Sequence, residues 1–471
     1  MKKIYNLIAI FAIMVGGFGC SGYLDDPKPT DVLTAQDIYG SNEGVQAYFS
    51  GIYRMFRSQY EDGNTHFGGV YSMYYARSVK ANDIISGPTW FLYDYAHTYR
   101  TPSKMRVTVT WQYFYEMINH ANTIVKEVTA STAIAEADKP VIIAEAKALR
   151  AFAYFQLYLE YYSKDSGLQT PPLYKEQVTE AGPMSDPAEY EAFMIQDIND
   201  AVAGLTDSRI NKSYMNKSVA QGLKARILMA LNKDWDQVEA AANAAYGGDA
   251  AAALDASIYA GGFNDLSASE VMWSMDQQSD QSNYYYIAPH AFADHNQDAY
   301  FGMFCNNTFV SNFTATDVRN EFWNGYGVPA TDYRQYITDK FVFAFDSDMH
   351  LMRKAEMVLI DAEANFRNGD ETTAHNLLFA LQSDRDPSAV KSANTGAALL
   401  EEILLERRKE LYAEIGVEWF DAKRLGRGIV RDGNHRVNLT LEPNDKRFFL
   451  TVPQAEIDAN DFIDDTVNDN R

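Results

Sequence analysis

The chain has 471 residues, of which 46% are hydrophobic, enough to bury one large core or two of ordinary size. Its formal net charge is −23, with 64 acidic and 41 basic residues, which argues against nucleic acid and anionic lipid headgroups as partners. Aromatic residues make up 13% of the chain, which indicates either an aromatic-rich core or rings displayed for a ligand.

Residues 1–19 have the three parts of a signal peptide. Lys2 and Lys3 precede an apolar run over residues 4–15, and a glycine-rich stretch then leads to Cys20. The run is shorter than the about 20 residues that a membrane-spanning helix needs. We expect lipid on Cys20, because a plain signal peptidase site would leave an unpaired thiol there; a buried N-terminal helix is the other alternative. Cys305 then has no disulfide partner.

Residues 20–36 are predicted to form a lipidated tether. Pro27 and Pro29 disfavour a helix and favour extended chain, which could lift the body about 30 Å from the membrane. The remaining residues, 37–471, are expected to form a single domain. A first helix is predicted from Asp37 to Phe56.

Helical patterns dominate residues of about 37–58, 104–246 and 349–425. One covers residues 105–128, and residues 142–159 carry apolar stripes on two faces, as in a helix sandwiched between others. Two more helices break at an Asn-x-Asp turn and restart, which predicts a pair around residue 233 and another around residue 369. The aspartates Asp234 and Asp370 are expected to cap the second helices. Paired helices predict a mainly α fold with a tetratricopeptide-like scaffold.

Residues of about 60–103 and 247–348 form the loop-rich part of the sequence. They are rich in Gly, Asn, Asp and Tyr and have no sustained helical period. Loops of this length in a compact domain are usually functional or disordered, and the aromatic density argues against disorder. We therefore expect the ligand-binding side here.

Motifs spread over nearly the whole mature chain resemble the SusD/RagB family of nutrient-capture lipoproteins. Their order and spacing carry the resemblance. They are Cys20-x-x-Tyr23-Leu24-Asp25, the helix around Trp111, Tyr115 and Asn122, Glu145-Ala146-x-x-Leu149-Arg150-Ala151-x-x-Tyr154-Phe155, Ala220-x-x-Leu223-x-Ala225-Arg226, Glu406-Arg407-Arg408-x-Glu410-Leu411, Glu418-Trp419-Phe420-Asp421 and Val452-Pro453-Gln454-x-Glu456-Ile457.

The resemblance implies a fold, a cellular location and a role in nutrient uptake. It implies four tetratricopeptide-like helix pairs with the loop-rich segments on one side, and a final strand at residues 452–457. It also implies lipid anchoring in the outer membrane of a Bacteroidetes-type bacterium, with Asp25-Asp26 as an acidic signal for surface display. Such proteins cover a TonB-dependent (SusC-like) barrel transporter and pass it captured ligand, typically a glycan and sometimes a peptide.

No active site is predicted. The run Glu406-Arg407-Arg408-Lys409-Glu410 is interpreted as mutual ion pairs on a solvent-facing helix, with Trp419 and Phe420 docked in the core. Acidic pairs such as Glu401-Glu402 are weak evidence for a hydrolase among 64 acidic residues. The sequence has no nucleophile elbow, phosphate loop or dinucleotide fingerprint. The protein is therefore predicted not to be an enzyme.

No metal site or cofactor is expected either. His290 and His295 are five residues apart and have no further ligand signature around them. Calcium could bind an acidic loop such as Asp346-Ser347-Asp348, but three residues are not a cage.

Aromatic residues beside glycines or polar residues are the best candidates for contact with a ligand. Flat rings cover the apolar faces of sugars while polar side chains bind the hydroxyl groups, although packing in the core is the competing interpretation for any single ring. Trp90 and Trp323 are the strongest candidates. The full set is Trp90, Tyr93, Tyr95, Tyr284, Tyr285, Trp323 and Tyr326.

The leading functional hypothesis is a surface-anchored, non-enzymatic protein that captures an oligosaccharide for a TonB-dependent transporter. Capture of peptides is one alternative, and would use polar edges and hydrophobic pockets rather than stacked rings. An adaptor that binds only proteins is another, since tetratricopeptide arrays usually bind other proteins. A glycoside hydrolase is a third, and needs a catalytic carboxylate pair.

Overall fold

The computed structural model describes residues 34–60, 67–164, 166–280, 289–297 and 299–471. The predicted signal peptide, Cys20, Asp25-Asp26 and most of the tether lie outside these residues, as do Tyr284 and Tyr285. Within the described ranges, no helix combines the length and the apolar character that crossing a membrane requires.

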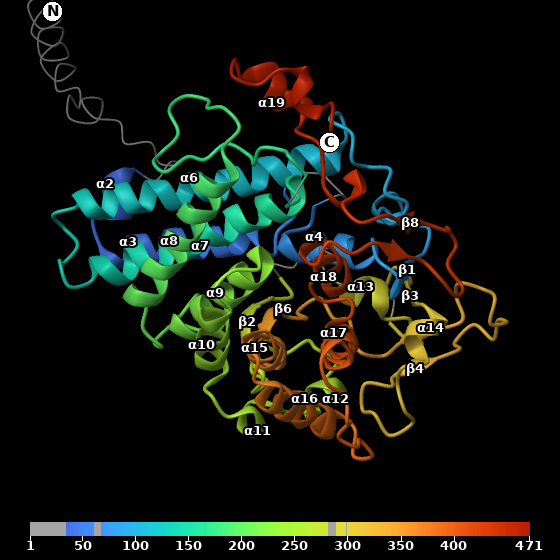
Figure 1. Ribbon diagram of the computed structural model, residues 1–471. Coiled ribbons are helices and arrows are strands. Elements are labelled where there is room, and N and C mark those ends of the chain that lie inside the picture. The colour runs from blue at the N-terminus through green and yellow to red at the C-terminus, as the bar shows by residue number, and fades with distance from the viewer. Residues whose placement is uncertain (1–33, 61–66, 165, 281–288, 298) are drawn as a thin grey trace, which may run out of the picture.

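Long helices packed in chain order form the scaffold (Figure 1). Each of the first three contacts the next, and α7 is buried at every residue from Ala148 to Tyr161, which confirms the predicted sandwiched helix. The same order continues through two helix pairs and a final long helix. The helices are α6 (Met105–Ala130), α7 (Lys139–Tyr161), α8 (Pro187–Gly204), α9 (Lys217–Leu231), α10 (Trp235–Tyr246), α15 (Lys354–Asn368), α16 (Glu371–Arg385) and α17 (Ala397–Leu411). The predicted mainly α, helix-pair fold is confirmed.

Each of the two predicted Asn-x-Asp turns joins the two helices of one pair: the first lies between α9 and α10, and the second lies between α15 and α16. Gly369 ends α15 with φ of 89°, a conformation that glycine adopts without strain, and the Asp370 side chain accepts the Thr373 N–H at 3.0 Å. The prediction for Asp234 is wrong. Asn232 and Asp234 are both left-handed, with φ of 52° and 48°, and the Asp234 side chain makes no capping bond.

Two other predicted elements differ from the structure. The first helix is two helices, α2 (Ala35–Tyr39) and α3 (Asn42–Met55), because the Ser41 side chain accepts the Gly44 N–H at 3.0 Å and begins a new helix. The strand implied at residues 452–457 is instead helix α19 (Gln454–Ala459), which follows Pro453. Proline favours the position before a first helical turn because it has no N–H to donate.

The loop-rich segments contain short helices and strands rather than continuous loop. In the part of the chain that the structure describes, the strands form four antiparallel pairs: β1 with β3, β2 with β6, β4 with β5 and β7 with β8. Within residues 60–103 and 247–348 the elements are α4 (Val70–Ser78), β1 (Ile84–Ser86), α5 (Leu92–Tyr95), α11 (Ala250–Ala253), α12 (Ser257–Ala260), β2 (Val271–Met275), α13 (Pro289–Ala293), β3 (Met303–Cys305), α14 (Asn307–Val310), β4 (Phe322–Trp323) and β5 (Ile337–Thr338). The short elements that follow later in the chain are β6 (Met349–Arg353), α18 (Val417–Arg424), β7 (Ile429–Val430) and β8 (Thr440–Leu441).

Some of these short elements share a second hydrophobic cluster beside the large cluster of the scaffold, whereas β6, α18, β7 and β8 pack into the large cluster. The smaller cluster packs β1, α13 and β3 around Tyr75, Phe292 and Phe304. A second core explains how short, irregular elements hold a fixed shape. Among the short elements, β1, β3, α14 and β4 lie on the right-hand side of the molecule in Figure 1, whereas α11 lies at the bottom.

The charged run on α17 is buried, so the prediction that it faces solvent is wrong. Glu406, Arg407 and Glu410 are 3%, 0% and 0% exposed. Arg407 binds Asp421 at 3.0 Å and Glu406 binds Arg319 at 2.6 Å, so their main partners are on other elements. Trp419 is fully buried and Phe420 is 7% exposed, which confirms their predicted docking in the core.

Glu410 is the centre of an ionic network between the scaffold and the loop-rich side. Its carboxylate accepts hydrogen bonds from Arg353 at 2.9 Å, Arg385 at 3.0 Å and Arg319 at 3.2 Å. Glu270 binds two of the same arginines. Burial opposes ionisation of Glu410, but the guanidinium groups more than offset it and hold the pKa of the carboxyl well below its usual range.

Cys305 provides a test of the second core. Its thiol is fully buried on β3, and burial raises its pKa, so little reactive thiolate forms near neutral pH. With Cys20 replaced by alanine, the folded protein should react negligibly with a thiol-specific reagent at pH 8. The same protein should show one reactive thiol per chain in guanidinium chloride, and fast reaction without denaturant would contradict this packing.

Candidate ligand-binding site

Pairing of β1 with β3 brings the Trp90 segment beside residues 299–305. The ladder joins Ile84 to Cys305 and continues through a bond from the Gly87 N–H to the Gly302 carbonyl at 2.7 Å. The half-buried Trp90 ring meets Tyr300 edge to face, with centroids 4.7 Å apart. Phe301 beside it is 39% exposed.

A hairpin formed by β4 and β5 adds Trp323 and Tyr326 to the same region. The Cys305 N–H donates to the Tyr336 carbonyl at 2.9 Å, which attaches the hairpin to β3. Trp323 is 42% exposed and Tyr326 is 44% exposed. Gly325 lies so close to the Trp323 ring and to Ile337 that an added side chain would clash with both. Glycine at this position lets the hairpin turn lie close against its own tryptophan.

His295 connects the β3 strand to the β4–β5 hairpin. One ring nitrogen, Nε2, lies 2.8 Å from the Met303 carbonyl oxygen, and the other, Nδ1, lies 3.0 Å from the Tyr326 hydroxyl. Burial lowers the pKa of His295, so the ring is neutral at pH 7. A neutral ring satisfies both contacts when Nε2–H donates to the carbonyl and the tyrosine hydroxyl donates to Nδ1. His295 thus fixes the position of Tyr326.

Asp339 fixes the Trp323 indole in a similar way. Its Oδ1 accepts the indole N–H at 3.1 Å and the Asn296 amide at 2.9 Å. The five rings Trp90, Tyr300, Phe301, Trp323 and Tyr326 lie on the segments that these contacts join and are called the aromatic face below. Three of them are well exposed and lie beside polar Asn296 and Asp339. The arrangement suits a ligand with apolar faces and hydroxyl groups.

The residues predicted to bind a ligand lie in different places in the structure. Trp90, Trp323 and Tyr326 lie on the aromatic face. Tyr93 is 45% exposed but stacks on Tyr99, with centroids 4.2 Å apart, away from these contacts. Tyr95 does not fit the predicted role, because it is fully buried and its hydroxyl lies 2.8 Å from His435 Nδ1. Helix α5 points Tyr93 and Tyr95 to opposite sides. Tyr284 and Tyr285 lie outside the described residues.

Sequence reasoning missed Tyr300 and Phe301, although the signal used for Trp90 applies to them. They stand in the loop-rich segment directly before Gly302. It also missed His295 and Asp339, whose role is to hold the rings of Tyr326 and Trp323, which lie far from them in the sequence. Their roles depend on the β1–β3 and β4–β5 pairings, which no local pattern encodes.

The described residues contain no group of three or more His, Cys, Asp or Glu that could hold a metal ion. His290 is buried and bonds the Phe263 carbonyl at 2.8 Å. Both oxygens of Asp348 accept backbone N–H groups, from Leu266 at 2.7 Å and Gln277 at 2.8 Å. Asp348 of the acidic loop considered for calcium therefore holds the backbone of two other segments.

The model of the SusD family matches residues 306–468. A SusD-like protein of Formosa agariphila is 22% identical over 91% of this chain and 93% of its own length.

Solved structures of low sequence identity share the fold. A SusD-like carbohydrate-binding protein from Bacteroides vulgatus has a TM-score of 0.80 at 24% identity, covering 90% of this chain and 98% of its own. Surface glycan-binding protein A from Bacteroides thetaiotaomicron, in complex with laminarihexaose, has a TM-score of 0.72 at 15% identity, covering 90% and 98%. The family model over residues 306–468, the curated relative and these solved structures together support a member of the SusD family.

Proposed function

We propose that this protein binds an oligosaccharide on its aromatic face. The observation that carries the proposal is the set of exposed rings, held in position by His295 and Asp339 beside polar side chains. Rings of this kind can cover the apolar faces of sugars, while Asn296 and Asp339 can bind hydroxyl groups. A structural relative that carries laminarihexaose supports the choice of a glycan. Members of the family are glycan-binding proteins and not enzymes, so we expect no turnover of the ligand.

Calorimetry with laminarihexaose and a panel of other oligosaccharides tests the proposal directly. Binding without any change in chain length of the sugar, measured by chromatography, is the expected result. Binding of peptides with no binding of sugars would replace the glycan with a peptide ligand. Release of shorter sugars by the purified protein, lost on replacing one carboxylate, would make it a hydrolase.

We further propose that residues 37–471 form one domain, held at the outer membrane by lipid on Cys20 and displayed at the cell surface. The domain would pass captured glycan to a TonB-dependent, SusC-like barrel. The signal-peptide pattern, the Cys20 motif and membership of the family support this proposal. Isolation of such a barrel with the tagged protein from outer membranes tests the partnership, and its absence would contradict it.

Replacing Cys20 with alanine should release the protein from the membrane. Two or three acyl chains anchor a protein almost permanently, and the variant would have none. After cell fractionation, the Cys20→Ala protein should appear in the soluble fraction, whereas a Ser21→Ala control should stay with the outer membrane. Retention of the Cys20→Ala variant on the membrane would contradict the anchor.

A further inference from the structure

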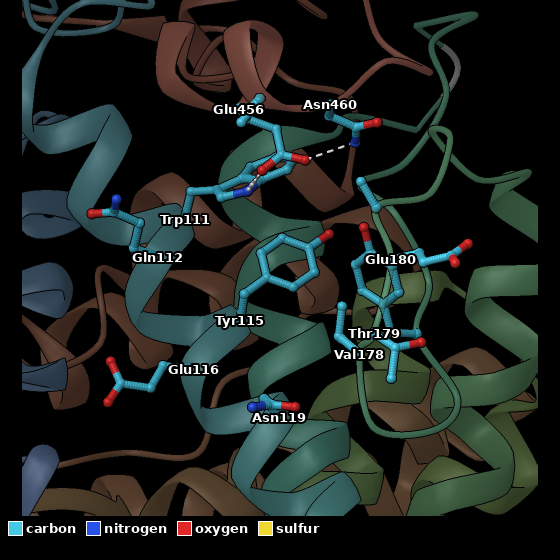
Figure 2. Close-up of a pocket in the computed structure, with 13 residues that line it drawn as sticks. Trp111, Gln112, Tyr115, Glu116, Asn119, Val178, Thr179, Glu180, Glu456 and Asn460 are labelled. Atoms are coloured by element: carbon cyan, nitrogen blue, oxygen red, sulfur yellow. Dashed lines mark hydrogen bonds between the residues drawn. The ribbon is translucent and has the colours of Figure 1, made fainter.

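A second site lies on the scaffold, away from the aromatic face. It is a cavity of about 500 Å³ between helix α6, the segment before α8 and helix α19. Pockets for small molecules usually have volumes of about 300–1,000 Å³. Figure 2 shows Trp111 and Tyr115 projecting from α6 towards Glu456 on α19 and Val178 on the facing segment.

Hydrogen bonds hold the walls in place without a ligand. The Asn122 amide donates to the carbonyls of Tyr174 and Glu176, at 3.1 and 2.7 Å, which ties the facing segment to α6. The Asn460 amide donates to the Gly182 carbonyl at 2.9 Å, which ties that segment to the end of α19. The cavity is therefore preformed, so a ligand would lose little affinity in ordering it.

The two ends of the cavity present acceptors, and its wall is apolar. At one end the Glu456 carboxylate accepts hydrogen bonds from the Trp111 indole at 3.2 Å and from the Asn460 amide at 2.8 Å, and both of these donors are neutral. At the other end, Asn119 Oδ1 is buried without a hydrogen-bond partner within the described part of the chain. A buried acceptor without a partner costs about 1–3 kcal/mol. Tyr115 lies between these ends in Figure 2.

The electrostatic character of the cavity selects against anions. Its lining includes Glu456, Glu116 and Glu180 but no Lys, Arg or His. The nearby Lys175 forms its ion pair with Glu189 at 2.8 Å and not with Glu180. Carboxylates at the rim of a concave site raise the local concentration of cations. Aromatic rings such as Tyr115 and Tyr174 also attract cations to their faces.

We propose that this cavity binds a small linear organic cation with donor groups at both ends and an apolar stem. An ammonium or guanidinium group binds Glu456, the stem lies along Tyr115, and the second donor group reaches Asn119. Trp111 and Asn119 are eight residues apart on α6, which is about 12 Å along the helix axis and matches a diamine with a short alkyl chain. The site is independent of the proposed glycan site.

Calorimetry with agmatine, which has a guanidinium group, a four-carbon stem and an ammonium group, tests the proposal on the purified mature protein. We expect agmatine to bind with an affinity that falls as salt is raised, and glucose not to bind. Glu456→Gln should weaken agmatine about tenfold or more, because a charge-assisted hydrogen bond is lost. Asn119→Leu, which removes the unpartnered acceptor at nearly constant size, should also weaken it.

Glu176→Gln is the matched control, because its carboxylate is exposed on the same facing segment but does not line the cavity. It should leave agmatine affinity unchanged. The proposal is overturned if agmatine does not bind the unsubstituted protein, or if it binds Glu456→Gln and Asn119→Leu as tightly as Glu176→Gln. Binding of laminarihexaose to all three variants, measured in parallel, shows that they are folded and reports on the aromatic face separately.

Discussion

Replacing Glu410 with alanine should destabilise the protein by about 3–5 kcal/mol, the range typical for a broken buried ion pair. Three guanidinium groups, those of Arg353, Arg385 and Arg319, would lose the carboxylate that they share. All three arginines are at most 1% exposed, so water cannot replace the lost partner. The change can be measured by urea denaturation, followed by circular dichroism.

The effect should depend on pH in a defined direction. The pKa of Glu410 is held well below its usual range in the folded state, so the carboxylate contributes stability that is present above its unfolded pKa, about 4.3. This contribution is lost as the pH falls through the folded pKa. The difference in unfolding free energy between Glu410→Ala and the unsubstituted protein should thus be largest near neutral pH and shrink in acid.

Glu401→Ala is a matched control on the same helix. Glu401 binds Arg427 at 2.6 Å, but the two side chains are 58% and 43% exposed, so this pair should contribute less than about 1 kcal/mol. Glu410→Gln separates loss of charge from loss of volume and should still destabilise strongly. Equal effects of Glu401→Ala and Glu410→Ala would mean that the buried network does not stabilise the fold.

The same residues show why the sequence predicted the helix of this network but not its environment. Charges at steps of three and four occur both on a solvated helix and on a helix whose face meets charges from elsewhere. The partners of Glu410 are Arg319, Arg353 and Arg385. They lie at least 25 residues away in the sequence, so the spacing of charges along one helix does not predict them. Long helices such as α7 were predictable because their apolar period is sustained. Short ones such as α4 and α5 depend on tertiary contacts and were missed.

The candidate site also contains some residues that the sequence could predict and others that it could not. Trp90 and Trp323 could be singled out because they stand in loop-rich segments beside glycine or polar residues. Tyr95 passed the same criterion and yet is buried, because helix α5 turns it towards Arg431, whose guanidinium carbon lies 3.9 Å from the ring centroid. The supporting contacts of His295 and Asp339 arise only when the β1–β3 and β4–β5 pairs have formed.

Replacing Trp323 with alanine should weaken glycan binding about 30-fold. Covering about 80 Å² of a ring face at about 25 cal/mol per Å² is worth about 2 kcal/mol, which is this factor in Kd. Trp323 is suited to the role because it is 42% exposed and Asp339 holds its indole nitrogen at 3.1 Å. Calorimetry with the best-bound oligosaccharide of the panel measures the change.

Two controls make the result specific to the aromatic face. Phe462→Ala removes a ring that is 65% exposed on the C-terminal segment, and Tyr95→Phe removes the buried hydroxyl that contacts His435. Neither should change glycan affinity by more than about twofold, since neither ring belongs to the face. Because Trp323 is 42% exposed and lies on a surface hairpin, its loss should lower the unfolding midpoint by only a few degrees. Unaltered glycan affinity in Trp323→Ala, with binding intact in the parent protein, would move the sugar to another surface.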